Sequence, residues 1–431
     1  MFDTGTTCFM IICTALVVLM SPALALFYCG LSRRKNVVNT MLMTLLAMGI
    51  AGILWFVIGD SIAYGGEPAY DDEGNLVNVL SLFFGGFDRM FTQWAVDELT
   101  GAAVELSGDY PGVVSVAFQA SFAMVTSAIV TGSLAGRAKF GVIALVSVLW
   151  PILVYAPMAH MTWGGGLIGE TIGALDFAGG TVVHISSGVS GLILALFLGK
   201  RRGFDNMSYR PHNVPFVMLG AGLLFFGWFG FNGGSALASD GIAGLAIANT
   251  LLAGCAASVC WVIIERIKNG KPTVVGASTG LVAGLVVVTP GCGYIDPWAA
   301  IVMGFLVSPV CYWAIAFAKR RIGYDDALDA FGCHGVGGIL GALLVGLFAD
   351  PALTPAGQSG LIYSGSFALL GKQFLGVVVT IVYVTVMVVI IALICKAVFH
   401  GSLRVDPDEE SQGLDTTIHG ESAYPAFSGL D

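Results

Sequence analysis

Long apolar segments recur along almost the whole chain, and this feature restricts its fold more than any other. A helix needs about 20 apolar residues to cross roughly 30 Å of hydrocarbon, because each residue adds about 1.5 Å. Eleven segments of the 431-residue sequence approach or exceed that length. They cover residues 7–31, 40–64, 112–136, 140–161, 178–199, 214–235, 242–265, 274–290, 297–318, 331–349 and 371–399. The sequence predicts an all-α polytopic membrane protein with eleven transmembrane helices.

The overall composition agrees with this interpretation. Charged residues make up 11% of the chain and hydrophobic residues 56%, whereas soluble domains average about 25% charged. The 59 glycines indicate close helix contacts, because lipid gives no hydrophobic drive for helices to associate. A net charge of −9 without a long basic run argues against nucleic-acid binding.

The basic residues predict how the chain is oriented in the membrane, since cytoplasmic loops are rich in Lys and Arg. With the N-terminus outside, 17 of the 19 Lys and Arg residues fall in inner segments, and Arg89 and Lys372 are the exceptions. The long outer loop 65–111 is acidic. Its carboxylates are Asp71, Asp72, Glu73, Asp88, Asp97, Glu98, Glu105 and Asp109. We expect a transmembrane domain over 1–400, retained without signal-peptide cleavage, and an acidic cytoplasmic tail over 401–431.

The nine cysteines lie in or beside apolar stretches and form no Cys-x-x-Cys pair. None lies in the acidic outer loop, where an oxidising compartment favours disulfides. We interpret them as small hydrophobic residues.

Two short runs show a weak internal similarity. LDFAGGTVVHISSG (175–188) opens the fifth span and LDAFGCHGVGG (328–338) opens the tenth, each with Leu-Asp before an intramembrane histidine. The spacing differs, from Asp176 to His184 against Asp329 to His334. Because five spans is an odd number, a duplicated five-helix unit is inverted relative to the first. We expect two inverted repeats, with the last span as an addition.

Ionisable residues inside hydrocarbon are costly and are candidates for function. His184 and His334 lie inside the fifth and tenth spans. Two histidines can simply be hydrogen-bonded within a bundle, but a matched pair favours a pore lined by neutral imidazoles sharing a proton. Axial ligation of a haem or a metal is a further alternative, opposed by the closely spaced glycines after His334.

Aromatic residues gather at the predicted outer ends of spans. Phe118 and Phe122 are four residues apart on one helix face, Trp163 lies just beyond the fourth span, and Phe231 and Ser235 lie at the end of the sixth. Such rings occur in interfacial belts, but rings with a hydroxyl near an acidic face also suit a small cation.

Five runs resemble the ammonium transporter family (Amt/Mep/Rh), in the same order and at similar separations. They are AHMTWGGG (159–166), LDFAGGTVVH (175–184), GWFGFNGGSA (227–236), TPGCGYI (289–295) and FGCHGVGG (331–338). The resemblance extends from FYCGLSRRKN (27–36) to GLDTTIHGESAY (413–424). It implies an eleven-helix homotrimer of the cell membrane, with one pore per subunit and PII-type regulatory proteins docking on the inner face.

The resemblance also implies roles for residues. Phe118, Phe122, Trp163 and Ser235 correspond to the outer ammonium-binding site, Phe122 with Phe231 to the gate, and His184 with His334 to the pore histidines. Asp176 matches an aspartate near that site, although it equally suits a helix cap. Two positions depart from the family, namely Cys29 in place of a small residue and Gly136 in place of a usual Glu.

These residues predict an ammonium transporter rather than an enzyme, with no cofactor or metal. Burying an ammonium ion costs tens of kcal/mol, and no carboxylate lies within the fifth or tenth span. We therefore expect ammonium to lose its proton and to pass as ammonia, with the proton carried by a separate route if flux is electrogenic. A sensor whose tail moves on binding is an alternative, which needs a signalling partner because the tail is too short for a catalytic domain.

Overall fold

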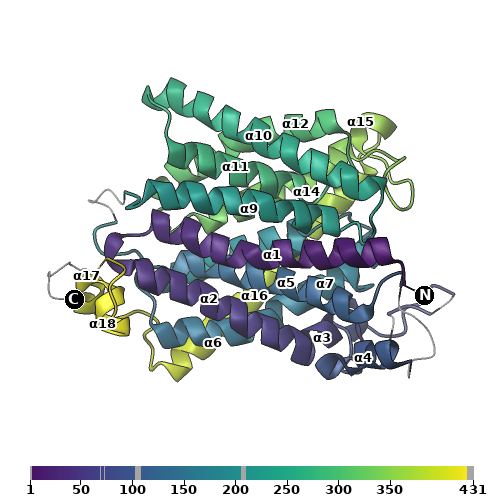
Figure 1. Ribbon diagram of the computed structural model, residues 1–431, viewed down its shortest axis with the longest axis horizontal. Coiled ribbons are helices and arrows are strands. Elements are labelled where there is room, and N and C mark those ends of the chain that lie inside the picture. The colour runs from purple at the N-terminus through teal and green to yellow at the C-terminus, as the bar shows by residue number, and fades with distance from the viewer. Residues whose placement is uncertain (1, 68, 72, 102–107, 205–209, 425–431) are drawn as a thin grey trace.

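The computed structural model describes residues 2–67, 69–71, 73–101, 108–204 and 210–424. Apart from loops and three isolated β-bridges, the described chain is helical. Ten of its helical segments are long and apolar enough to cross a membrane. The bundle they form is drawn in Figure 1 with the helix axes close to horizontal.

The principal helices agree with the segments expected from the sequence. They are α1 (Thr4–Leu31), α2 (Val37–Leu54) with η2 (Trp55–Gly59) and α3 (Asp60–Tyr64), α5 (Gly112–Thr131), α6 (Phe140–Trp150) with η6 (Pro151–Tyr155) and α7 (Ala156–Trp163), η8 (Gly180–Ile185) with α8 (Ser186–Leu198), α9 (Val214–Gly234), α10 (Gly241–Asn269), α11 (Val274–Val288), α12 (Pro297–Trp313) with η9 (Ala314–Ala318) and α13 (Lys319–Ile322), η10 (Phe331–Gly335) with α14 (Val336–Phe348), and α16 (Ala368–Val398).

Ten of the eleven expected spans have a counterpart of sufficient length, and α11 is the exception. It has 15 residues and extends about 22 Å at 1.5 Å per residue, which is short for a span. It is nevertheless apolar, and its sides pack against α10 and α12. A short helix is stable there because most of its surface meets protein rather than lipid.

Local sequence signals explain several helix boundaries. The carboxylates of Asp3 and Asp240 accept hydrogen bonds from Thr6 N and Ala243 N, and Asn213 accepts one from Phe216 N, which satisfies donors in the first turns of α1, α10 and α9. Pro297 starts α12, where its missing N–H costs nothing. Pro151 begins the π-helical η6, since it cannot continue the regular hydrogen-bond ladder.

Five of these segments, η2, η6, η8, η9 and η10, are π-helical turns within longer helices. π-helical turns are rare in proteins, but those that occur are often found at functional sites. Two of them, η8 and η10, hold the intramembrane histidines His184 and His334.

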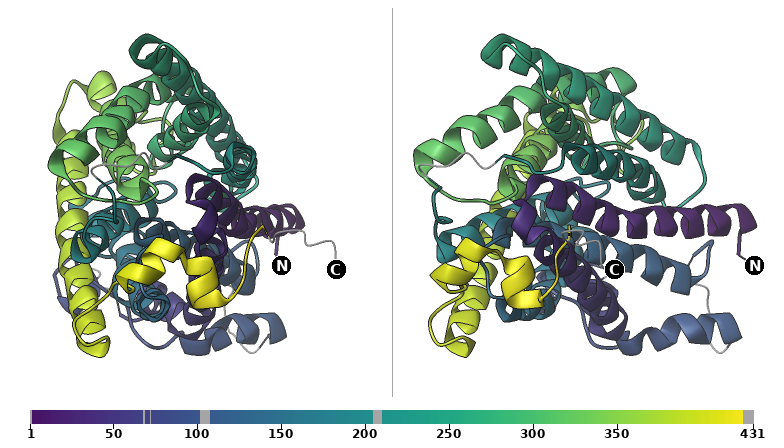
Figure 2. Two further views of the ribbon diagram at one scale, coloured as in Figure 1. Left: turned by 90° about the vertical axis from the view of Figure 1, so that its left-hand side faces the viewer. Right: turned by 60° about the vertical axis from the view of Figure 1, so that its left-hand side comes forward.

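The first helices of the two expected halves, α1 and α9, pack along each other, and α2 packs against α5. The N-terminus lies at the right-hand end of the bundle in Figure 1, and the short helices α17 (Pro407–Gln412) and α18 (Leu414–His419) lie at the opposite end. Figure 2 shows these two helices lying across that end, which we call the tail end. The start of α1 and the tail helices α17 and α18 therefore lie at opposite ends of the bundle.

All nine cysteines are free, and six of them are buried. The outer loop contains α4 (Gln93–Thr100), where Glu98 is buried and accepts a hydrogen bond from Gly112 N at 2.5 Å. Two of the acidic residues noted in this loop, Asp72 and Glu105, lie outside the described residues, as do residues 425–431 of the tail.

Candidate functional site: a column of rings above two buried histidines

The aromatic residues singled out in the sequence meet at the end of the bundle opposite the tail. Phe118 and Phe122 on α5 lie with ring centroids 4.9 Å apart. Trp163, the last residue of α7, lies 6.4 Å from Phe122 with its ring nearly perpendicular. Helices that are distant in sequence thus bring three rings into one cluster. Both phenyl rings are buried, whereas Trp163 is half-buried.

The orientation of Trp163 is fixed by a hydrogen bond, because its Nε1 donates to the backbone carbonyl of Asp176 at 2.8 Å. Ser235 lies directly after α9 and is half-buried. Its hydroxyl donates to the carbonyl of Phe231 one turn earlier, at 2.9 Å. A hydroxyl oxygen that donates to its own helix keeps its lone pairs available as acceptors. The cluster therefore offers ring faces and one hydroxyl oxygen beside a partly accessible indole.

Directly next to this cluster, Phe122 and Phe231 stack with centroids 4.1 Å apart and planes 28° from parallel. Both rings are fully buried. The stack continues to His184, whose ring lies 5.9 Å from Phe231 at 18°. Four rings from α5, α9, η8 and η10 thus form one column, in which the phenyl pair separates the outer cluster from the histidines.

The two histidines face each other at the end of this column. The Nδ1 atoms of His184 and His334 are 3.3 Å apart, and the ring centroids are 5.3 Å apart. Because both atoms are Nδ1, one ring must donate its N–H and the other accept, so the pair shares a single proton at this contact. His184 is completely buried, and its Nε2 has no hydrogen-bond partner among the described residues.

This spacing opposes the alternative in which the histidines are the two axial ligands of a haem. Two nitrogens on opposite sides of one iron are about 4 Å apart, since metal–nitrogen bonds are about 2 Å long. The described residues also contain no group of three or more His, Cys, Asp and Glu side chains suited to a metal ion.

Asp176 caps the segment that carries His184. Its carboxylate accepts hydrogen bonds from the backbone N–H groups of Gly179, Gly180 and Thr181, at 2.6–2.9 Å, and from the Thr181 hydroxyl. The interpretation of Asp176 as a helix cap agrees with these contacts. The carboxylate fixes the start of η8, and through it the position of the His184 ring.

The structure corrects the alignment of the two similar runs. The sequence comparison paired Asp176 with Asp329, but the residue that caps η10 is Asp326, whose Oδ2 accepts from Phe331 N at 2.7 Å. Asp176 and Asp326 each lie eight residues before their histidine, and each bonds the N–H five residues later. The Leu-Asp pair at residues 328–329 suggested the wrong alignment of the two runs. The constant eight-residue separation was the signal in the sequence that could have identified Asp326.

Glycines allow the two histidine segments to cross closely. A Cβ at Gly188 on α8 would collide with the backbone nitrogen of Gly335. A Cβ at Gly338 on α14 would lie 3.0 Å from both the Gly180 carbonyl and the His184 Cβ. Each histidine segment packs against the helix that follows the other one, because α8 contacts η10 and α14 contacts η8. Gly188 and Gly338 each follow their histidine by four residues, so the crossing repeats in both halves.

Sequence reasoning missed one further residue of this site. Trp228 on α9 lies beside His184, with ring centroids 5.5 Å apart and planes 26° from parallel. Its Nε1 donates to Thr289 Oγ1 at 3.0 Å, which holds the indole against the imidazole. Trp228 precedes Phe231 by three residues and so shares its helix face, a signal that was present in the sequence.

Comparison with known proteins identifies the family. The Ammonium Transporter Family model matches residues 8–424. The chain belongs to the ammonium transporter family. It is 44% identical to an ammonium transporter of Bacillus subtilis over 424 residues, which covers 97% of this chain and 98% of the relative.

Solved structures agree with this assignment. The structure of Mep2 from Candida albicans has a TM-score of 0.84 and 30% identity, and the match covers 95% of this chain and 88% of Mep2. A sensor Amt protein has a TM-score of 0.84 and 28% identity, with 96% and 98% of the two chains covered. The expected membrane transporter, rather than an enzyme, is therefore confirmed.

In this ammonium transporter, backbone contacts attach the tail to the segment between α5 and α6. Val405 N donates to the Arg137 carbonyl, and Lys139 N donates to the Leu403 carbonyl, both at 3.0 Å. Side chains add to these contacts, because Glu410 pairs with Arg404 of the tail at 2.6 Å and also accepts a hydrogen bond from Arg202 N at 2.8 Å. The Arg202 guanidinium donates to the Pro407 carbonyl at 2.8 Å and lies 3.0 Å from the Ser411 hydroxyl.

Arg137 is the fully buried centre of this region. Its guanidinium donates to the carbonyls of Gly199, at 3.0 Å, and of Asp325, at 2.5 Å. Burial lowers the pKa of Arg137 to about 10. The neighbouring Asp325 is also desolvated, which raises its pKa, but its hydrogen bonds to Arg201 and the charge of that arginine outweigh burial, so its pKa is lowered overall. Both groups therefore remain charged at neutral pH.

The structure shows what surrounds Gly136 and Cys29, the two residues that depart from the family pattern. Gly136 has φ +76°, and a Cβ there would lie 2.8 Å from Asn36 Nδ2. Asn36 Oδ1 accepts from Leu414 N of the tail at 3.0 Å, so the glycine leaves room for a tail contact. Cys29 is buried and its thiol donates to the Leu26 carbonyl at 3.2 Å, which is an ordinary intrahelical position.

Proposed function

We propose that this family member binds ammonium at the outer ring cluster, removes a proton, and passes ammonia between Phe122 and Phe231 and along His184 and His334. The observation that carries the proposal is the continuous column of rings ending on a histidine pair with Nδ1 atoms 3.3 Å apart. A path with this lining offers polar edges to a neutral molecule but no fixed charge to an ion.

Recruitment depends on the outer cluster in this proposal. A small cation gains about 0.5–2 kcal/mol over an aromatic face, most of all over tryptophan. Trp163 is half-buried, so it is accessible from outside, and Phe118 and Phe122 complete the aromatic wall. Ser235 supplies a hydroxyl oxygen that accepts an N–H of ammonium.

Selectivity follows from the cost of desolvation. A bare cation in an apolar site loses tens of kcal/mol of hydration energy, and the ring column holds no carboxylate to offset that loss. Ammonium escapes the penalty by leaving its proton behind, whereas potassium has no proton to lose. Asp176 supports the site from outside the column by fixing η8 and the Trp163 indole.

The stacked Phe122 and Phe231 must separate for ammonia to pass, because both rings are buried and their centroids are 4.1 Å apart. Side-chain rotations occur on fast timescales compared with transport. The pair therefore acts as a gate that closes behind each molecule and keeps water out of the histidine segment.

For the architecture, we propose eleven spans with α11 counted as the eighth, two inverted five-helix repeats and α16 added at the end. The matched capping by Asp176 and Asp326 supports the repeats. We assign residues 1–400 to the membrane domain and 401–431 to a cytoplasmic tail, with the N-terminus outside. A tag near Asp97 is then accessible from outside intact cells and a C-terminal tag is not, and the opposite result contradicts the orientation.

We further propose that the chain forms a homotrimer in the cell membrane, with one pore per subunit and membrane lipid around the assembly. A PII-type regulatory protein would dock at the tail end, where backbone contacts join Leu403 and Val405 to the helix ends. Cross-linking in membranes tests the trimer, and co-purification of a PII-type protein tests the partner.

Ammonium-evoked current in proteoliposomes tests the transport mechanism. Ammonium should produce uptake that potassium neither supports nor inhibits. A current that scales with uptake shows that the proton follows by a separate route, and uptake without current shows net ammonia flux. Equal transport of potassium and ammonium would contradict the proposed deprotonation.

A further inference from the structure

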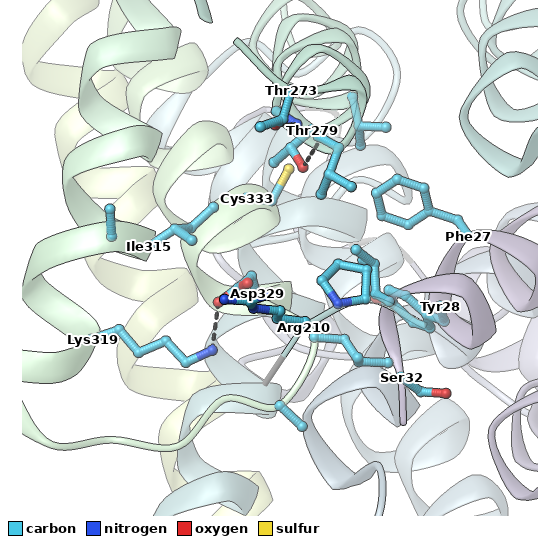
Figure 3. Close-up of a pocket in the computed structure, with 18 of the residues that line it drawn as sticks. Phe27, Tyr28, Ser32, Arg210, Thr273, Thr279, Ile315, Lys319, Asp329 and Cys333 are labelled. Atoms are coloured by element: carbon cyan, nitrogen blue, oxygen red, sulfur yellow. Dashed lines mark hydrogen bonds and ion pairs between the residues drawn. The ribbon is translucent and has the colours of Figure 1, made fainter. Parts of the chain in front are cut away.

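A cavity of about 500 Å³ opens at the tail end of the bundle and is not part of the ring column. Figure 3 shows it between Phe27 and Tyr28 of α1 on one side and Ile315 and Lys319 of η9 and α13 on the other. Cys333 and His334 of η10 also line it, so the cavity extends to the inner histidine. Its volume is in the range of sites for small organic ligands.

Cationic side chains outnumber carboxylates in the lining. The cations are Arg33, Arg201, Arg210, Lys319 and Arg320, and the carboxylates are Glu265 and Asp329. Two of the cations are already in ion pairs, since Arg201 bonds Asp325 at 2.6 Å and Lys319 bonds Asp329 at 2.7 Å. The cavity therefore keeps an excess of positive charge after these pairs are counted.

Arg210 and Arg320 carry this excess. Both line the cavity, and neither has an ion-pair or hydrogen-bond partner in the described chain. Glu265 forms no ion pair with either arginine among the described residues, because its carboxylate oxygens face the Thr273 N–H and hydroxyl, at 2.7–3.1 Å, and its single negative charge offsets only one of the two. Guanidinium groups in a concave site bind phosphate through paired charge-assisted hydrogen bonds.

The rest of the wall favours an organic molecule over a bare inorganic ion. Phe27, Trp261 and Ile315 are apolar surfaces of the cavity, and Trp261 is held edge-on against Tyr312 at 5.6 Å. Hydroxyl groups add little polarity, because Tyr28 OH and Thr279 Oγ1 already donate to the backbone carbonyls of Ile129 and Val275. A ligand with an anionic group and a compact apolar or aromatic body matches both parts.

We propose that this cavity binds a phosphate-bearing organic anion, held at the phosphate by Arg210 and Arg320. The phosphate comes either from a soluble phosphorylated metabolite or from the head group of an anionic lipid. Because the cavity reaches His334, the bound anion blocks the inner exit and slows transport. This second statement rests on the proposed function, whereas the binding itself does not.

The binding test uses the full-length protein in phosphatidylcholine nanodiscs, with pyrophosphate as the probe and sodium chloride to match ionic strength. Isothermal titration should give saturable binding. Arg210→Gln and Arg320→Gln should each raise Kd by about tenfold, as expected for the loss of one charge-assisted hydrogen bond. Arg321→Gln is the matched control, since it removes the same charge one residue away at a side chain that does not line the cavity and lies over the Phe317 ring.

Absence of saturable binding at millimolar pyrophosphate overturns the proposal, as does equal weakening by all three substitutions. Nanodiscs containing phosphatidic acid separate the two sources. A raised apparent Kd for pyrophosphate in them assigns the site to a lipid head group, and an unchanged Kd assigns it to a soluble metabolite. Inhibition of ammonium uptake by pyrophosphate at the tail end is measured separately, so a failure of the transport mechanism leaves the binding result intact.

Discussion

The two histidine segments use the same plan but lie in different surroundings. His184 follows its capping aspartate by eight residues, and so does His334. Asp176 serves three backbone N–H groups at 2.6–2.9 Å, whereas Asp326 serves one, that of Phe331, and accepts its second bond from the Ser133 hydroxyl at 2.7 Å. His184 lies against the rings of Trp228, Phe231 and His334, while His334 also borders the cavity at the tail end. The two segments thus hold their imidazoles in the same way and differ in what surrounds them.

In the proposed mechanism, the half of the site beside the ring stack excludes ions and the half beside the tail end releases ammonia. The ring stack separates His184 from the aromatic cluster around Trp163. A cavity of about 500 Å³ with basic side chains borders His334 and would serve as the exit. Positive charge near that exit disfavours entry of ammonium from the tail end, because like charges repel in a partly desolvated site.

Removal of the two capping carboxylates should have the largest effect. Asp176→Ala leaves three buried N–H groups without a partner, at about 1–3 kcal/mol each, whereas Asp326→Ala leaves one. We expect Asp176→Ala to lower the melting temperature of the purified protein clearly more than Asp326→Ala, and to reduce uptake at least tenfold. Equal melting temperatures would mean that the two caps are equivalent. Asp176→Asn, which keeps one acceptor oxygen, serves as the control.

The next largest effect should come from placing a carboxylate at each histidine. His184→Asp introduces a group that attracts cations and offsets part of the desolvation barrier, as acidic rings do in cation channels. Potassium should then permeate or inhibit ammonium uptake. His334→Asp should lose less selectivity, because the basic side chains of the cavity oppose its charge. Reversal potentials in mixed ammonium and potassium solutions measure both.

If His184→Asp and His334→Asp both keep the selectivity of the unmodified protein, the histidines are not the filter. Phe122 and Phe231 would then provide the selectivity alone. His184→Asn, which is polar but uncharged, separates the effect of charge from the effect of shape.

A smaller effect is expected at the outer cluster. Trp163→Leu keeps bulk but removes the ring that binds cations best, so the half-saturation concentration of ammonium should rise roughly 2- to 30-fold, which corresponds to about 0.5–2 kcal/mol. Maximal uptake should change little. Trp298→Leu is a suitable control because Trp298 is 46% exposed and lies on α12, away from the cluster. An unchanged half-saturation concentration would show that the indole does not recruit the substrate.

The smallest effect should come from the tail. Glu410→Gln weakens the pair with Arg404, in which the Glu410 side chain is 2% and the Arg404 side chain 27% exposed, so about 1–3 kcal/mol of tail contact is at stake. We expect normal membrane insertion, a change in uptake of less than about threefold, and faster proteolysis of the tail in inside-out vesicles. Asp408→Asn at an exposed position should leave proteolysis unchanged. Unaltered proteolysis in Glu410→Gln would mean that backbone contacts alone hold the tail.

The sequence by itself determined the membrane class, the span boundaries within a few residues and the candidate residues of the site. Hydrocarbon admits only chains that satisfy their backbone internally, so the length and order of apolar runs leave few alternatives. The motifs around Trp163, His184, Phe231 and His334 then named the family that the comparisons show. These properties are local, because each depends on residues close together along the chain.

Only the tertiary structure shows which residues contact each other across the site. Nothing in the runs around Asp326 and Asp329 shows which carboxylate meets the N–H of Phe331, because a strong local similarity at Leu-Asp pointed to the wrong one. The place of Trp228 beside His184, the shortness of α11 and the cavity between α1, α10 and α13 depend on how helices distant in sequence cross. Those crossings depend on close packing of small residues such as Gly188 and Gly338, and a contact of that kind exists only once both helices are in place.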